Sequence, residues 1–218
     1  FLMVLIGGIT RLTESGLSMV EWKPITGIIP PITQQDWERQ FNLYKQFPEY
    51  QKINFGMSLE QFKFIFYWDY FHRVLGRLIG MAFLFPWLYF VFSKKLNSSL
   101  NKKIAIAFFL GGLQGFMGWF MVKSGLVDHP DVSQYRLAAH LILAFIIMGY
   151  LMGIILSLYP SQDYGNGVDR WFKRFAILIS AVLGLQILYG AFCAGTNAGF
   201  SFNTFPKMGT EWFPTGFF

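Results

Sequence analysis

Four long apolar segments dominate this sequence and limit what it can fold into. They cover residues 64–92, 104–122, 137–159 and 175–194. Each is near or above the roughly 20 residues that a helix needs to cross a hydrocarbon core of about 30 Å. A fifth segment, residues 1–10, would rise only about 15 Å as a helix, and we expect it to be the end of a helix whose start is missing. The sequence therefore predicts an all-α integral membrane protein.

Composition supports the membrane assignment. Hydrophobic residues make up 54% of the 218 and charged residues only 14%, whereas a soluble domain carries about 25% charged residues. The net charge of +6 is not gathered into a basic patch with interleaved aromatic residues, so membrane lipid is an expected partner and nucleic acid is not. The single cysteine excludes an internal disulfide framework and a CxxC metal or redox motif. The chain opens inside an apolar run without a charged leader, so no signal peptide is expected.

The loops between the apolar segments predict an orientation. Basic residues without acidic neighbours flank residues 97–101, and three more basic residues lie in the connection 160–174. The loop 11–63, in contrast, carries six basic and six acidic residues. By the positive-inside rule, the two basic loops face the cytoplasm or matrix. Loop 11–63 then faces the periplasm or intermembrane space of a multi-pass inner-membrane protein.

The outer loop contains two predicted helix starts. Thr33 and Asp36 resemble an N-cap, followed by an apolar face at helical spacing that is expected to end at Pro48. Ser58 and Gln61 have the form of a capping box, so the second membrane helix should begin above the membrane. The short helix could be a lid over the outer face or an ordinary interfacial helix, and the sequence leaves both open.

A weak internal repeat indicates two related halves. The matched positions, at a constant offset of 183, are residues 7 and 16–18 with residues 190 and 199–201. The fifth apolar helix thus restarts the pattern of the first. We expect residues 1–159 to form the first four-helix bundle of an eight-helix, two-bundle protein. Residues 160–218 would then hold an inner loop, the fifth transmembrane helix and the start of the second outer loop, an incomplete second bundle.

Two histidines inside the apolar helices are candidate ligands of one metal. His72 lies about eight residues into the apolar part of its helix, and His140 about seven residues past an expected N-cap at Ser133. Both helices are predicted to run inward, so both imidazoles lie roughly 10–12 Å below the outer surface. Imidazoles at matched depth on parallel helices can ligate one heme iron from opposite faces. The alternative is a pair of unrelated histidines bonded to neighbouring helices, and His129, in a short outer loop, is expected to be solvated.

A carboxylate and a glycine share the helix face of His72. Asp69, His72 and Gly76 are spaced at i, i+3 and i+7. Gly76 would leave room for a flat macrocycle to pass close to the backbone. Asp69 would place a carboxylate one turn outward from the ligand. Ionisable residues at such positions are costly and usually face the interior of the bundle.

Three arginines lie close to the two histidines in the sequence. Arg73 follows His72 directly, Arg77 comes one turn later, and Arg136 precedes His140 by one turn. The planar fork of a guanidinium binds carboxylates such as heme propionates in a bidentate way. The alternative is that these arginines snorkel to the interface or pair with the nearby aspartate.

Several motifs resemble the heme A synthase family, in its mitochondrial and alphaproteobacterial type. The most specific is the first-loop run of residues 8–18, which continues through residues 21–27. Shorter matching runs are found at residues 47–50, 61–63, 72–77, 114–119, 122–126, 136–140 and 203–208. The resemblance therefore covers the whole chain.

The resemblance implies an oxidoreductase that acts on a CH group of heme. Members oxidise the C8 methyl of heme O to a formyl group, which gives heme A for terminal oxidases. The first half would hold the substrate heme O between His72 and His140, and the second half a heme b that passes electrons. An electron donor is then required, and heme O synthase and a second copy of the chain are candidate partners. Because the second histidine pair lies outside residues 1–218, we expect these residues alone to be inactive.

Asp69 stands where the family carries a catalytic glutamate, three residues before the first histidine. The carboxylate is kept but is one methylene shorter. It could accept a proton, or orient a water, while the methyl group is oxidised. The cysteine pair found in the first loop of some bacterial members is absent here, so a mechanism that relies on that pair does not apply.

Two other classes of membrane protein fit parts of the pattern. A di-heme membrane cytochrome b, which carries electrons to or from quinone, also needs matched histidine pairs. The first-loop motif and the carboxylate beside His72 favour the synthase. A transporter with an inverted repeat fits less well, because four helices per half give a parallel rather than an inverted relation.

Overall fold

Helices account for almost all of the regular structure of this chain. The structure, a computed structural model, describes residues 1–21, 26–125, 132–159, 169–201, 204 and 206–213. Within these ranges four helices are long and apolar enough to cross a membrane. They are α4 (Leu59–Phe92), α5 (Ser98–Gly125), α6 (Gln134–Leu158) and α7 (Arg170–Gly195). The prediction of an all-helical, multi-pass membrane protein is confirmed, and the four apolar segments are its long helices.

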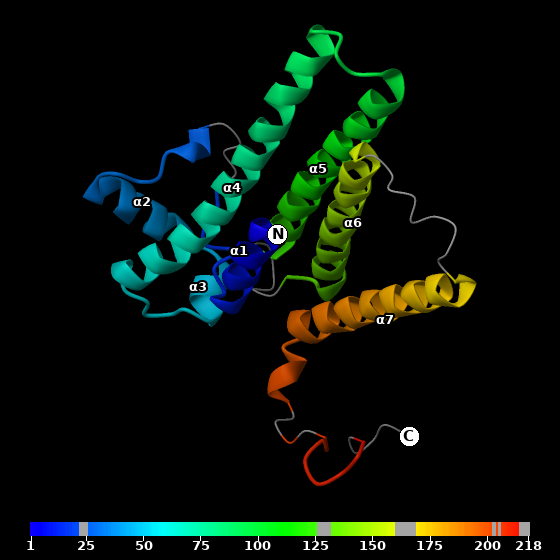
Figure 1. Cartoon of the computed structure of the whole chain (residues 1–218). Helices are drawn as coiled ribbons and strands as arrows, with labels where there is room; N and C mark the ends of the chain where they lie inside the picture. Colours follow the sequence, from blue (N-terminus) through cyan, green and yellow to red (C-terminus); the bar gives the residue numbers. More distant parts are fainter. Residues whose placement is uncertain (22–25, 126–131, 160–168, 202–203, 205, 214–218) are drawn as a thin grey trace.

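Three membrane helices and the shorter α1 (Leu2–Leu12) form the bundle. α1 packs on α4, α4 on α5, and α5 on α6, and Figure 1 shows α4, α5 and α6 running along one another. α7 packs on α6 and crosses its lower end in Figure 1. Along the described parts of the chain, α4 and α6 do not pack closely on each other. The two helices that carry His72 and His140 are therefore separated across the bundle.

The outer loop folds against the first turns of α4. It contains α2 (Gln34–Tyr44) and the short α3 (Pro48–Lys52), as well as a 3-10 turn, Thr26–Ile28. One face of α2 and one face of α4 form a buried aromatic cluster of Trp37, Phe41, Tyr44, Phe62, Ile65 and Phe66. This cluster holds six of the eleven buried apolar residues of the described chain, so burial is concentrated where the outer loop meets the first turns of α4.

Both predicted helix starts are present, and each is a capping box. The Thr33 hydroxyl accepts a hydrogen bond from the Asp36 amide, and the Ser58 hydroxyl accepts one from the Gln61 amide, with the reciprocal bonds also made. The expectation for Pro48 was wrong. α2 already ends at Tyr44, and Pro48 begins α3, because the first helical position needs no amide hydrogen and suits the fixed φ of proline.

Tyr44 is the one tyrosine of the aromatic cluster, and its burial changes the pKa of its phenol. Tyr44 is fully buried, and its hydroxyl accepts a hydrogen bond of 2.8 Å from Asn54 Nδ2. Burial first, and the charge of Glu49 second, raise the pKa of Tyr44 well above its ordinary value. The phenol therefore stays protonated and can donate as well as accept.

The internal repeat is visible in the ends of α1 and α7. Their C-caps, Thr13 and Thr196, are 183 residues apart and have nearly the same backbone angles. Each threonine hydroxyl donates to the carbonyl four residues earlier, at 2.8 Å in both cases. The next residues, Glu14 and Asn197, are both left-handed, with φ of 51° and 54°. Two segments 183 residues apart thus terminate their helices in the same way.

The ends of three helices meet on one side of the bundle. The Tyr135 ring at the start of α6 lies 5.6 Å from the Phe192 ring near the end of α7. Arg11, at the end of α1, donates to the carbonyl of Ala194, also near the end of α7. The predicted topology assigns these three ends to the same side of the membrane, and the structure brings them together.

Candidate functional site

His72 lies on α4 and is packed against a glycine of α1. A Cβ added to Gly7 would lie 3.3 Å from His72 Nε2, so a larger residue there would crowd the imidazole. The glycine thus provides the space in which the ring sits. No sequence pattern predicted a role for Gly7 at the site, although the internal repeat includes this position.

His140 lies on α6 and has a similar neighbour on α5. A Cβ added to Gly118 would lie 3.2 Å from His140 Cε1. Gln114, one turn earlier on α5, donates from Nε2 to the His140 carbonyl at 3.1 Å, and the same atom lies 3.3 Å from His140 Nε2. His140 Nδ1 and Gln114 Oε1 are buried with no hydrogen-bond partner in the described chain. Buried polar atoms are nearly always paired, so these two leave capacity for a further ligand or water.

The two imidazoles come from separate helices. α4 and α6 do not pack closely along their described lengths, yet an electrostatic interaction links His72 and His140. The side chains therefore lie in the same interior region of the bundle. The residues fit a bis-histidine iron site in their donor atoms and in the glycine that leaves room beside each ring. Ligation of one iron by both remains a prediction.

Asp69 is held by an arginine and by the first loop. Its side chain is almost fully buried. Arg73 donates to both carboxylate oxygens, from Nε and Nη2, each at 2.8 Å, and the Met19 amide donates to Oδ2 at 3.1 Å. Arg73 Nη2 also donates to the Met19 carbonyl at 3.1 Å. The Asp69–Arg73 ion pair thus holds the first loop, at Met19, against α4, one turn outward of His72.

The remaining predicted site residues lie in different surroundings. Gly76 faces α1, where a Cβ would meet Met3 Cε at 3.4 Å. The Arg136 guanidinium lies 4.0 Å from the centroid of the Phe120 ring and donates to the Phe120 carbonyl at 3.4 Å. Arg77 is partly buried one turn below Arg73 on α4. Asp69 therefore pairs with Arg73 in this structure and not with Arg136. His129 lies outside the described residues.

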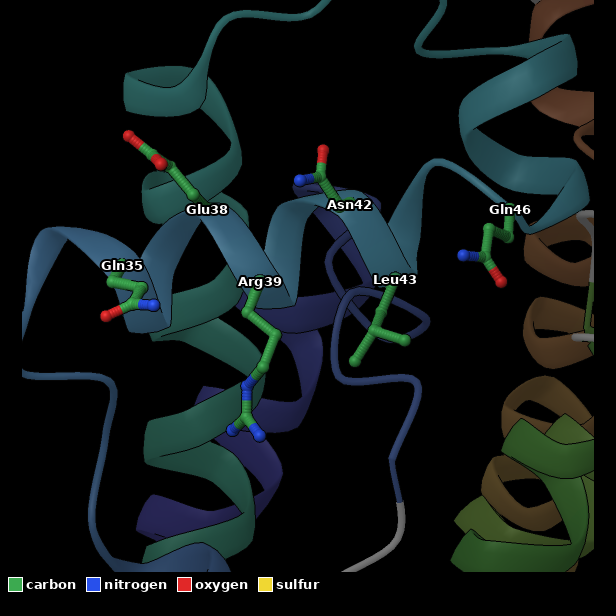
Figure 2. A pocket seen from close by; sticks show the side chains of 6 residues that line it. All are labelled: Gln35, Glu38, Arg39, Asn42, Leu43 and Gln46. Atoms are coloured by element: carbon green, nitrogen blue, oxygen red, sulfur yellow. The ribbon is translucent and has the colours of Figure 1, made fainter.

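A shallow depression on α2 is separate from this site. It is lined by Gln35, Glu38, Arg39, Asn42, Leu43 and Gln46 (Figure 2). All six belong to α2 or follow it directly, on the side away from the buried aromatic cluster. The depression contains neither histidine nor Asp69, so it is not part of the candidate site.

The glycine beside each imidazole leads to a prediction. We expect Gly118→Ala in the full-length protein to weaken heme binding by up to about tenfold and to shift the heme absorption maximum, because its Cβ displaces the His140 ring. Gly115→Ala is the matched control, since a Cβ there meets nothing within 4 Å and alanine favours the helix. Heme titration followed by visible absorption measures both variants. Equal affinities for the two would show that Gly118 does not position the histidine.

Comparisons with known proteins concern the whole chain. A family described as cytochrome oxidase assembly protein matches residues 1–218. A heme A synthase from Nitrosospira multiformis is 50% identical over 220 residues, which cover 100% of this chain and 62% of the relative. A heme A synthase from Parvibaculum lavamentivorans is 48% identical over 218 residues, covering 100% of this chain and 63% of the relative. A third, from Flavobacterium psychrophilum, is 49% identical, covering 95% and 61%.

The chain spans less than two thirds of the length of these curated relatives. No solved structure matches it.

Proposed function

Because the chain belongs to the family of cytochrome oxidase assembly proteins, we propose that the protein of which it is part is a heme A synthase. The proposed reaction oxidises the C8 methyl of heme O to a formyl group. The product, heme A, is then available for terminal oxidases. The observation that carries the proposal is the identity of about 50% to heme A synthases over the whole chain, a range that contains the candidate site.

We place the substrate heme O between His72 and His140. Three features support this placement: the two imidazoles, the glycine beside each ring and the separation of α4 from α6. The heme iron supplies the redox chemistry when it is bound. The protein holds the macrocycle, orients it and excludes water.

Asp69 is proposed to serve the oxidation of the methyl group. It is a buried carboxylate one helical turn outward of His72, where an ionised group is costly unless paired. Arg73 and the Met19 amide hold its two oxygens in place. A carboxylate fixed in this way can accept a proton from the reacting carbon or orient a water. Arg73 is then a positioning residue, and Arg77 and Arg136 are proposed to bind the heme propionates.

The reaction also needs an electron acceptor, a place in the membrane and a source of heme O, and we propose each of these. Electrons leave the substrate and must pass to an acceptor, which we place in a second bundle with its own heme b. The division at residue 159, suggested by the offset of 183, separates the substrate half from the electron-transfer half. We propose an inner-membrane location with the outer loop on the periplasmic or intermembrane side. The reason is that the loops with an excess of basic residues, around 97–101 and in 160–174, lie at the other ends of the membrane helices. Heme O synthase is a proposed partner, since its product is the substrate.

A di-heme cytochrome b is the second candidate, and pigment analysis separates the two. The full-length protein is expressed in a host that makes heme O and lacks heme A, and membrane hemes are extracted and identified by mass. A synthase gives formyl-bearing heme A. A cytochrome gives only the hemes that the host already contains, and that result would overturn the proposal.

A further inference from the structure

The contact between Arg11 and Ala194 joins equivalent positions of the two repeats. Arg11 Nη2 donates to the Ala194 carbonyl at 2.6 Å, and the two residues are 183 positions apart. This separation equals the offset of the internal repeat, which the matched ends of α1 and α7 follow. Contacts between equivalent positions occur on the axis that relates two copies. The contact therefore marks the place where the two repeats meet.

Arg11 caps the end of α7. The last carbonyls of a helix lack intrahelical partners and carry the negative end of its dipole. The Arg11 guanidinium donates to one of them, that of Ala194, and also to Asn197 Oδ1 at 3.1 Å. Asn197 is in the left-handed conformation just past the helix end. One cation from the first repeat thus satisfies two acceptors at the end of the second.

The repeats differ in sequence at the positions that form the contact between Arg11 and the end of α7. The equivalent of Arg11 is Ala194, and the equivalent of the exposed Leu12 is the buried Gly195. A Cβ on Gly195 would lie 2.7 Å from Gln134 Cα, so the end of α7 can approach α6 only with glycine there. A second arginine at position 194 would bring two guanidiniums together. Each difference therefore allows a contact that identical repeats could not make.

We propose that Arg11 is a one-sided clasp that joins the two halves of the protein at their outer ends. The clasp selects unlike halves, because pairing two first halves in this way would set Arg11 against Arg11. The contacts on which it rests do not involve His72, His140 or Asp69. Its acceptors at the end of α7 are the Ala194 carbonyl and the Asn197 side-chain amide oxygen.

Exchanging the arginine between the repeats tests the proposal. The full-length protein is purified in detergent, and its thermal midpoint is measured. We expect Arg11→Ala to lower Tm by a few °C, and Ala194→Arg to lower it further because two guanidiniums then face each other. The double variant with both changes should recover most of the loss. By the symmetry of the contact, an arginine at 194 would reach the carbonyl of residue 11 and the side chain of Glu14, the equivalent of Asn197.

Two controls make the outcome decisive. Arg39→Ala removes an exposed arginine on α2 and should leave Tm unchanged. Asn197→Gly keeps the left-handed backbone and removes one acceptor, so its loss should not add to that of Arg11→Ala. A double variant of Arg11→Ala and Ala194→Arg that loses as much as the two single variants together would overturn the proposal. So would an Arg11→Ala protein no less stable than Arg39→Ala.

Discussion

Replacing either His72 or His140 by alanine in the full-length protein is expected to abolish the low-spin, bis-histidine absorption of the heme in the first half. Each variant removes one of the two proposed axial ligands of the iron. Heme content should fall from about two per protein to about one, with the heme of the second half retained. Visible absorption and heme quantification of the purified variants measure the effect.

The third histidine of the chain provides the matched control. His129 is predicted from the sequence to be solvated, so His129→Ala should leave both the spectrum and the heme content unchanged. If His72→Ala or His140→Ala behaved like His129→Ala, the assignment of that histidine as a ligand would be wrong.

Replacing Asp69 by asparagine is expected to reduce formyl production per bound heme by about 10²–10⁴-fold, the usual effect of losing a proton-transfer group. The amide is nearly isosteric, so heme binding should be retained. Asp69→Glu should stay active, since the resemblance indicates glutamate at this position in the family. The measurement is the amount of heme A formed for each bound heme O.

The observed ion pair calls for a second variant. Asp69 accepts two hydrogen bonds from Arg73, so part of its role could be to hold that arginine and the Met19 segment. Arg73→Gln removes the ion pair and keeps the carboxylate. If Asp69 acts in the reaction, Arg73→Gln should lower heme occupancy and retain more turnover per bound heme than Asp69→Asn. Equal turnover in the two variants would leave Asp69 only its structural role.

Local signals in the sequence predicted the helices well. The capping boxes at Thr33 and Ser58 involve residues three apart, so they form as soon as the helix does. The long apolar segments predicted the membrane helices, and in the structure each helix begins three to six residues earlier than its segment. The apolar face of α2 was also predicted, since its spacing alone shows which side is buried. Only Pro48 was misplaced, because proline fits both a helix end and a helix start.

Contacts between distant segments were beyond the reach of sequence patterns. The sequence left open whether Asp69 pairs with Arg73 or Arg136, and the fold decides it by placing Met19 beside Asp69, 50 residues away. The glycines beside the imidazoles depend on how α1 meets α4 and how α5 meets α6. No periodicity within one helix carries that information. The internal repeat came nearest, since it had singled out Gly7 without giving it a role.

The separation of the two ligand nitrogens tests the proposed heme site most directly. It is measured in an experimental structure of the full-length protein loaded with heme O. If His72 and His140 ligate one iron, their Nε2 atoms lie about 4 Å apart on opposite faces of the macrocycle, since each metal–imidazole bond is about 2 Å long. A separation of more than about 6 Å, with heme bound elsewhere, would contradict the assignment.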